Sequence, residues 1–276
     1  LVFCNHVLMG GPVGAASGAP FRVKAHGSEL EYSMRGRPEL ERWGAETLAQ
    51  ADATFVGSAH IREVLDQVVG HVANVFEVPP GVDVDEFVLE DRETARARLL
   101  EEARADPPNP GNANERLPDD GNAERLATFL VGDEPTVVYF GKLIEQKGVQ
   151  VLLEAMRHVD ARLVVVGFGP NRAALEAAAP PRTLFTGPFE HRHLRHLLPL
   201  ADVTVVPSIF PEAFGMVAAE AAAARVEVGA ETVANARVPC ASGVMQIGDA
   251  NLVRNAITHM GEAVDRKVSV RIGDAG

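Results

Sequence analysis

Two segments in the middle of the chain decide its fold: TVVYFGKLIEQKG at residues 136–148 and RLVVVGFG at residues 162–169. In each segment a largely apolar run ends at a glycine, and a stretch with helical spacing follows. Apolar runs that do not alternate with polar residues are typical of strands covered on both faces, as in a parallel sheet between layers of helices. We therefore predict that each segment is a strand that leads into a helix.

The same pattern continues toward the C-terminus. We expect strands at 136–140, 162–166, 183–186 and 202–206, and helices at 149–159, 170–179, 191–200 and 214–224. This succession predicts a doubly wound α/β domain, in which ligands bind at the carboxyl ends of the strands.

The N-terminal part repeats the pattern less regularly, with strands expected at 21–25, 53–58 and 75–78 and helices at 38–51 and 59–69. Residues 90–105 are rich in Arg, Glu and Ala and predict a solvated helix held partly by charge pairs. The Pro-, Asn- and Gly-containing stretch up to residue 122 predicts a linker. We therefore expect a partial N-terminal domain over 1–90, a charged helix and linker over 91–134, and a C-terminal domain over 135–276, with 225–276 unassigned.

The composition argues against several classes of protein. The 276 residues include 26 Lys and Arg against 38 Asp and Glu, a net charge of −12, which is unlike a nucleic-acid-binding surface. Two cysteines do not make a disulfide scaffold or a four-cysteine zinc site, and they favour a reducing compartment. No apolar run is long enough for a transmembrane helix. The first residue is Leu1 rather than Met, which indicates a fragment or a processed product.

The loop after the strand at 136–140 contains two of the few lysines in this arginine-rich chain. Lys142 and Lys147 flank the turn into a helix N-terminus, where free N–H groups already favour an anion. Two ammonium groups beside these donors suit a diphosphate. The alternative is a solvated loop whose lysines bind nothing.

A Gly-x-Gly turn follows the strand at 162–166. Gly167 and Gly169 allow the backbone to pass close to a nucleotide. Arg172 stands where a dinucleotide-binding fingerprint has its third small residue, which argues against NAD. The alternative is a tight turn between strand and helix without a ligand.

Two carboxylates frame the start of the helix expected at 214–224. Glu212 precedes Phe214 and Gly215, and Glu220 lies about two turns further along. A carboxylate at either position can accept hydrogen bonds from sugar or ribose hydroxyls, and helix N–H groups favour the charge of Glu212. The alternative is one carboxylate at a helix N-terminus and one exposed glutamate.

Three histidines, His191, His193 and His196, lie on the helix expected at 191–200. No set of carboxylates or cysteines completes a metal site around them in the sequence. We expect no metal and interpret these histidines as a solvated helix face.

In this order the motifs resemble the donor domain of retaining glycosyltransferases of family 4, which have the two-domain GT-B fold. The resemblance rests on the loop with two lysines, the Gly-x-Gly turn and the Glu-x7-Glu element with Phe-Gly inside it. The first half also looks like the family's acceptor domain, at Asn5-His6, 26–29, 57–58 and 79–87. The whole resemblance covers about residues 1–224. The family's first strand and Gly-rich loop, and its pattern after Ala224, have no match, so we expect an N-terminally truncated chain that diverges after residue 224.

The resemblance implies two Rossmann-like domains facing a cleft, the first of them incomplete, and transfer of a hexose from a nucleotide-sugar with retention. No cofactor is implied, since the nucleotide-sugar is a substrate. We expect a cytoplasmic protein that does not bind nucleic acid. The acceptor (lipid, saccharide or small metabolite) and peripheral contact with a membrane are left open. The main alternative is a catalytically inactive fragment or nucleotide-binding remnant; a sugar-nucleotide epimerase or a phosphorylase fits the motifs less well.

The resemblance also implies a role for each residue that matches a family motif. His6 would lie near the transferred sugar, and Glu212 would hold its hydroxyls, so these two are the expected catalytic residues. His26 and Ser28 would lie on the acceptor side. Lys142 and Lys147 would hold the diphosphate and Glu220 the ribose; the full set for donor binding is Lys142, Lys147, Gly167, Gly169, Phe214, Gly215 and Glu220.

Overall fold

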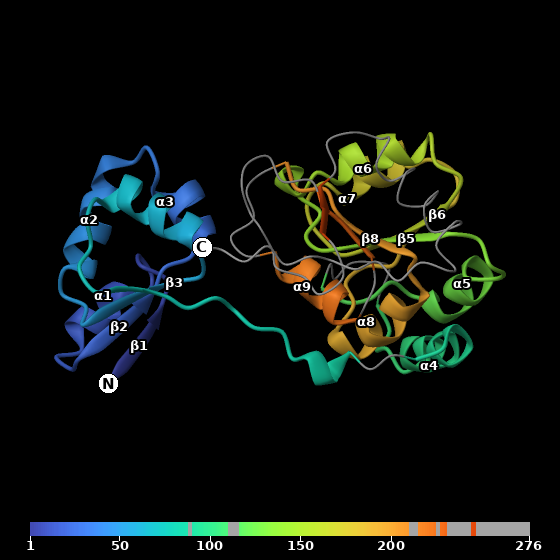
Figure 1. The fold of residues 1–276 in the computed structure, drawn as a ribbon, viewed down its shortest axis with the longest axis horizontal. Coiled ribbons are helices and arrows are strands. Elements are labelled where there is room, and N and C mark those ends of the chain that lie inside the picture. The colour runs from blue at the N-terminus through green and yellow to red at the C-terminus, as the bar shows by residue number, and fades with distance from the viewer. Residues whose placement is uncertain (88–89, 110–115, 210–214, 225–226, 231–243, 247–276) are drawn as a thin grey trace, which may run out of the picture. The chain divides into compact units, whose positions relative to one another are not determined.

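A computed structural model describes residues 1–87, 90–109, 116–209, 215–224, 227–230 and 244–246 of the chain. They form two compact units, a first unit from Leu1 to Gly81 and a second unit that begins at Val82. Each unit contains one parallel sheet with helices packed on it (Figure 1). Both units are therefore α/β structures built on a parallel sheet, as the sequence predicts.

The sheet of the first unit has the strand order β1-β2-β3-β4. Its strands are β1 (Val2–Asn5), β2 (Phe21–Lys24), β3 (Ala53–Val56) and β4 (Val75–Glu77). Its helices are α1 (Gly11–Ala16), the π-helix η1 (Glu29–Met34), α2 (Pro38–Leu48) and α3 (Ala59–Val69). The sequence predicts β2, β3, β4, α2 and α3 but neither β1, at the start of the chain, nor α1, whose six residues are mostly Gly and Ala.

One face of this sheet packs against helices and the other does not. Cys4, Val23 and Val56 belong to the buried core of the first unit. Alternate residues of a strand point to opposite faces, and Phe3 and Phe76 are accordingly 60% and 52% exposed. Phe55 lies between them, with a ring-centroid distance of 6.0 Å to each. Within the described residues, the first sheet is therefore covered on one side only.

The second unit contains a sheet of order β10-β9-β8-β5-β6-β7, in which all neighbours are parallel. Its strands are β5 (Thr136–Phe140), β6 (Arg162–Val166), β7 (Thr183–Phe185), β8 (Val203–Val206), β9 (Glu227–Ala230) and β10 (Val244–Gln246). Every residue of β5, β6 and β8 is buried. This confirms that the apolar runs are strands covered on both faces.

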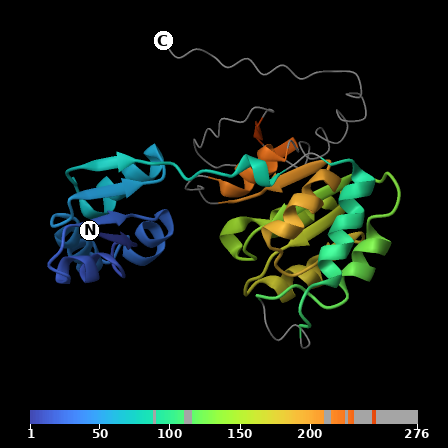
Figure 2. The ribbon, with the colours of Figure 1, turned by 90° about the horizontal axis from the view of Figure 1, so that it is seen from below.

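Helices cover both faces of the second sheet. They are α4 (Arg92–Arg104), α5 (Asn122–Phe129), α6 (Val149–Met156), α7 (Arg172–Ala178), α8 (His191–Leu197) and α9 (Met216–Ala223), with short 3-10 turns at η2 (Val84–Glu86), η4 (Glu145–Lys147) and η5 (Leu198–Leu200). Val137 and Val165 pack toward α6 and α7, whereas Val138 and Val164 pack toward α4, α5 and α8. Figure 2 shows the helices of these two layers on either side of the strands. The result is a three-layer α/β/α unit.

The segment between the two expected domains differs from the prediction. Ala95 and Leu99 of α4 and Leu126 of α5 are fully buried in the core of the second unit. Arg96 donates a hydrogen bond to the Ala127 carbonyl at 2.6 Å and so ties the two helices together. In place of the solvated helix expected here, α4 and α5 form a packed layer of the second unit, because one apolar side of α4 is hidden among many charged residues.

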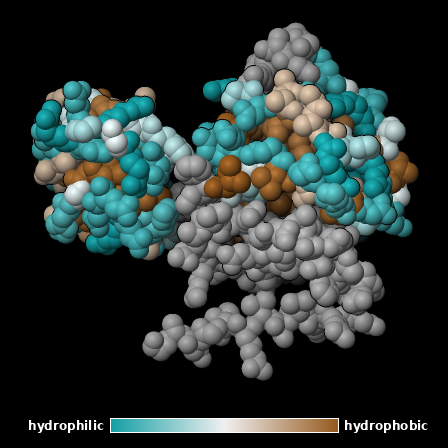
Figure 3. Space-filling model, turned by 90° about the horizontal axis from the view of Figure 1, so that it is seen from above, coloured by the Kyte–Doolittle hydropathy of each residue, from teal (hydrophilic) through white to brown (hydrophobic). Residues whose placement is uncertain are grey.

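None of the helices in the described part of the chain is long and apolar enough to span a bilayer. On the face drawn in Figure 3, apolar residues reach the surface among hydrophilic ones in each unit. Scattered exposed apolar residues of this kind are ordinary on protein surfaces.

Candidate functional site

The loops that follow β5 and β6 lie directly against each other. A Cβ atom on Gly167 (φ +148°) would lie 1.8 Å from the Gly141 carbonyl oxygen, and one on Gly169 (φ +154°) would lie 2.4 Å from the Leu143 carbonyl oxygen. The Leu143 N–H donates to the Phe168 carbonyl at 2.7 Å. Only glycine fits at 167 and 169, so the Gly-x-Gly turn is required by the close approach of two backbones.

The two lysines expected to hold a diphosphate both belong to the loop after β5. Lys142 is exposed, and its carbonyl accepts a hydrogen bond from the Tyr139 hydroxyl at 2.8 Å. Lys147 ends the turn η4 and precedes Gly148, the N-cap residue of α6. The Ile209 N–H, beyond β8, donates to the Gln146 carbonyl at 3.1 Å. The structure therefore places both ammonium-bearing residues in one loop at the carboxyl ends of the central strands, where a ligand of this fold binds.

Arg172, which breaks the dinucleotide fingerprint, has a structural partner. Its guanidinium forms a two-pronged contact with the buried carboxylate of Asp119, with 2.8 Å between Nη1 and Oδ1. Hydrogen bonding to Asp119 raises the pKa of Arg172 further above its usual value. Because this pair fastens the start of α7 to the segment before α5, Arg172 serves the packing of the second unit.

Glu220 lies on α9, which begins after Gly215 in a left-handed conformation (φ +84°). Its side chain is almost fully buried, with 9% of the residue exposed. Burial raises the pKa of Glu220, and the neighbouring His191 opposes that rise. The alternative in which Glu220 is an exposed glutamate is therefore wrong. Glu212 and Phe214 lie outside the described residues.

The predicted solvated face is wrong for His193 and His196, which are buried, whereas the side chain of His191 is 59% exposed. His193 has no exposed surface, and its Nε2 lies 2.9 Å from Asp106 Oδ1 while its Nδ1 accepts the Glu190 N–H at 3.3 Å. His196 is buried as well, with Nδ1 2.8 Å from Glu90 Oε2. The acidic residues in and around α4 could have indicated this burial, since Glu90 and Asp106 supply the carboxylates that the two histidines contact. Among the described residues, no group of three or more His, Cys, Asp or Glu could hold a metal ion.

In the first unit, His6 and His26 lie together at the carboxyl ends of β1 and β2. Their ring centroids are 4.4 Å apart, and His26 Nε2 lies 2.6 Å from Asn5 Oδ1. Burial, followed by the neighbouring His6, lowers the pKa of His26. Ser28 is exposed and precedes the π-helix η1. The structure thus brings together two residues that the sequence assigned to different roles, His6 to catalysis and His26 to the acceptor side.

Glu29 is a residue of this site to which the sequence assigned no role. Its buried carboxylate accepts hydrogen bonds from the Val7 N–H at 2.7 Å and the Leu8 N–H at 2.8 Å. It also lies 3.6 Å from Nδ1 of His6, which has the left-handed φ of +80° that is unusual for histidine. Glu29 therefore stabilises the loop that presents His6.

The described hollows of the second unit lie away from the lysine loop. One, of about 610 Å³, is lined by Arg125, Phe129, Arg162 and Arg182 among others. Arg162 is the first residue of β6, so this hollow is at the amino ends of the strands. A ligand of a doubly wound sheet binds at the opposite edge.

The chain matches known proteins over most of its length. Residues 134–262 match the family described as Glycosyl transferases group 1, and the match runs beyond residue 224, where we expected the resemblance to end. The D-inositol 3-phosphate glycosyltransferase of Xylanimonas cellulosilytica is 33% identical over 204 residues, 70% of this chain and 43% of that protein. The GDP-mannose-dependent alpha-(1-6)-phosphatidylinositol monomannoside mannosyltransferase of Mycobacterium tuberculosis is 30% identical over 280 residues, 92% of this chain and 63% of that protein.

Solved structures agree on the fold. The sucrose-phosphate synthase of Thermosynechococcus elongatus has a TM-score of 0.68 at 23% identity, over 95% of this chain and 64% of its own. The Anabaena protein HepE in complex with UDP-glucose also has a TM-score of 0.68, at 17% identity, over 93% of this chain and 66% of its own. The chain thus spans less than two thirds of the length of the two curated relatives that it matches. It has the GT-B fold, its relatives are named glycosyltransferases, and its residues 134–262 are similar to the glycosyl transferases of group 1.

Proposed function

We propose that this chain acts as a retaining glycosyltransferase that moves a hexose from a nucleotide-sugar to an acceptor. The observation that carries the proposal is the pair of interlocked loops after β5 and β6, which present Lys142 and Lys147 at the ligand-binding edge of the second sheet. The similarity of residues 134–262 to the glycosyl transferases of group 1 supports it.

The donor is held by groups of complementary charge. Lys142 and Lys147 hold the diphosphate, and they stabilise the negative charge that grows on its oxygens as the glycosidic bond breaks. Gly167 and Gly169 let the backbone approach the nucleotide. Glu220 accepts hydrogen bonds from the ribose, and Glu212, with the N–H groups near Phe214 and Gly215, holds the sugar hydroxyls.

The acceptor side is formed by the first unit. His6 and His26, whose ring centroids are 4.4 Å apart, offer polar groups to an acceptor hydroxyl, and His26 also contacts Asn5. Front-face attack by this hydroxyl gives retention and needs no protein nucleophile. The names of both curated relatives include an inositol derivative, so we propose inositol phosphates and phosphatidylinositol mannosides as the first acceptors to test. A lipid acceptor would bring the protein to a membrane surface.

A panel of nucleotide-sugars and nucleoside diphosphates tests the donor. A ligand that binds only the folded chain raises its melting temperature, by an amount that grows with ligand concentration. The panel includes UDP, GDP, UDP-glucose and GDP-mannose, and the best donor is then incubated with the inositol acceptors. Binding without transfer to any acceptor favours the inactive alternative, and the absence of any nucleotide binding contradicts the proposal.

The lysines give a sharper test. Lys142→Ala and Lys147→Ala should each weaken nucleoside-diphosphate binding by about ten- to hundredfold in calorimetry, since a charge-assisted hydrogen bond contributes roughly 1.5–3 kcal/mol. Binding of the unphosphorylated nucleoside should change little. Arg62→Ala, which removes one exposed positive charge from the first unit, is the matched control. Equal losses for the nucleoside and the diphosphate would rule out the diphosphate assignment.

A further inference from the structure

His191 lies between two carboxylates that come from distant parts of the sequence. Its Nδ1 is 3.0 Å from Glu86 Oε2, and its Nε2 is 3.4 Å from Glu220 Oε1. Glu86 belongs to the turn η2 and Glu220 to α9, while His191 is the first residue of α8. One imidazole therefore connects three elements of the second unit.

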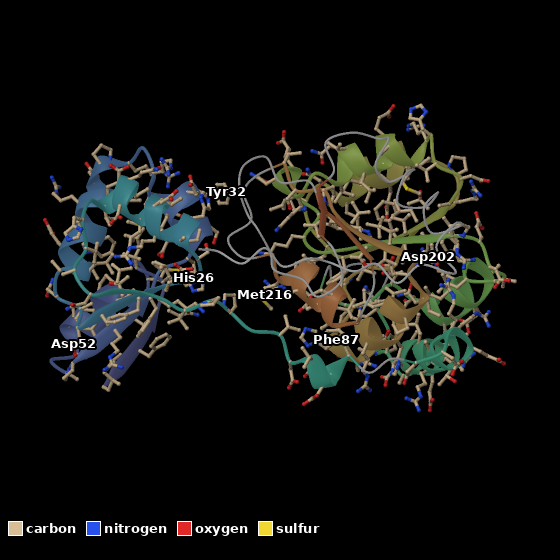
Figure 4. The ribbon with its side chains drawn as sticks, viewed as in Figure 1. His26, Tyr32, Asp52, Phe87, Asp202 and Met216 are labelled. Carbon is tan, nitrogen blue, oxygen red and sulfur yellow. The ribbon has the colours of Figure 1, made fainter. Side chains whose placement is uncertain are left out.

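The surroundings hold this ring in place. The Phe87 ring lies next to His191, with 6.2 Å between the ring centroids, and Phe87 itself is buried in the core. Figure 4 marks Phe87 in the segment just before α4 and Met216 at the start of α9. His191 is more than half exposed and Glu220 is not, so solvent reaches the contact from the side of the histidine.

The chemistry of the three groups is complementary. An imidazole that is protonated at both nitrogens donates to two carboxylates at once. Burial on its own favours the neutral form of Glu220, which has a proton to donate and one fewer lone pair to offer. A donor at His191 favours the carboxylate form, which accepts hydrogen bonds from a diol. Besides its partners Glu86 and Glu220, His191 has the charged residues Glu190 and Arg192 beside it in the chain.

We propose that His191 is a positioning residue for Glu220, and that it holds Oε1 of the carboxylate so that Oε2 accepts from the ribose hydroxyls of the nucleotide. Glu86 orients the imidazole through its other nitrogen. This inference rests on the proposed function, in which Glu220 binds the ribose. It adds a Glu86–His191–Glu220 connection that determines how well the protein distinguishes a ribose from a sugar without hydroxyls.

The experiment uses UDP or GDP, whichever binds more tightly. Calorimetry compares the affinity of this ribonucleotide with that of its 2′,3′-dideoxy counterpart. In the unaltered protein the ribonucleotide should bind more tightly. His191→Ala should reduce this preference by about tenfold, the equivalent of one hydrogen bond to a charged group, and should leave the dideoxy affinity nearly unchanged. His191→Gln, which can still donate one N–H to Glu220, should restore part of the preference.

Two further variants separate positioning from folding. Glu86→Gln should lower the ribose preference less than His191→Ala, because it removes only the group that orients the ring. His196→Gln removes a histidine–carboxylate contact from the same helix without touching Glu220, and should keep the full preference. Melting temperatures of all four variants report on folding.

The outcomes distinguish this inference from the proposed function. If the unaltered protein binds neither UDP nor GDP, the proposed function fails and the inference with it. If it binds one of them with a ribose preference that persists in His191→Ala, the inference alone is overturned. Equal losses for the ribo- and dideoxynucleotide would also overturn it, because they would show a purely structural role.

Discussion

The surroundings of Gly167 allow only glycine at this position. Its backbone has a φ of +148°, and the Gly141 carbonyl occupies the space that any side chain would need. Neither restriction is visible in the sequence, where Gly167 is one of 25 glycines. The Gly-x-Gly spacing indicates a tight turn, and the structure adds the reason for it, which is a second loop that packs on the first.

We expect Gly167→Ala to destabilise the protein far more than Gly132→Ala. Both glycines have a positive φ, but a Cβ on Gly132 would meet nothing within 4 Å. Gly132→Ala should therefore cost only the left-handed strain, about 1–2 kcal/mol of stability. Gly167→Ala adds a backbone clash and should cost more than about 3 kcal/mol, as severe core substitutions do. Chemical denaturation of both variants measures the difference. Similar losses would mean that the loops separate at little cost.

Glu220 gives a prediction about pH. Burial raises its pKa in the folded chain, so ionisation costs more there than in the unfolded chain, where glutamates titrate near about 4.3. The contribution of Glu220 to the free energy of unfolding is therefore greatest below about pH 4.3, and it decreases as the pH rises through the raised pKa of the folded chain. Glu220→Gln removes the ionisation. It should therefore raise the melting temperature at about pH 7, and this gain should disappear near about pH 4.

Thermal denaturation of the unaltered protein and Glu220→Gln across this range checks the sign. The same variant should weaken nucleotide binding at about pH 7, since a neutral amide accepts more weakly than a carboxylate. A variant that is less stable than the unaltered protein at neutral pH would show that the contact with His191 outweighs the cost of burial.

At the scale of elements, carboxylates with little exposed surface join one element to a neighbouring one. Glu29, on the π-helix η1, accepts two N–H groups from the loop after β1. Asp106, after α4, meets His193 on α8. In both cases an acidic residue that looks like part of a solvated surface in the sequence is buried and holds another element.

We expect Glu29→Ala to destabilise the first unit by about 2–4 kcal/mol, because it leaves two loop N–H groups without their charged acceptor. Glu31→Ala is the matched control, since Glu31 lies on the same π-helix and pairs with the exposed Arg35. It should change stability by less than about 1 kcal/mol. Chemical denaturation followed by a probe in the first unit measures both. A Glu29→Ala variant as stable as Glu31→Ala would show that water replaces the carboxylate.

The whole molecule combines two parallel sheets that are covered differently. The second sheet is buried on both faces by α4, α5 and α8 on one side and α6 and α7 on the other. The first sheet has one face packed by helices and one face with the exposed rings of Phe3 and Phe76. The burial patterns of their strands differ in the same way, continuous in β5 and alternating in β2. The hydrophobic pattern along a strand therefore reports how many of its faces are covered.

The sequence alone determined the α/β class, the strands β5, β6 and β8, and the loops that contain Lys142 and the Gly-x-Gly turn. It could do so because local periodicity and turn chemistry depend on neighbours in the chain. Only the tertiary structure showed that α4 and α5 belong to the second unit and that Glu220 contacts His191. Histidine–carboxylate contacts join residues far apart in the sequence, 87 positions for His193 with Asp106 and 105 positions for His191 with Glu86. No local pattern encodes which distant carboxylate fills the space beside a buried histidine, because packing makes that choice.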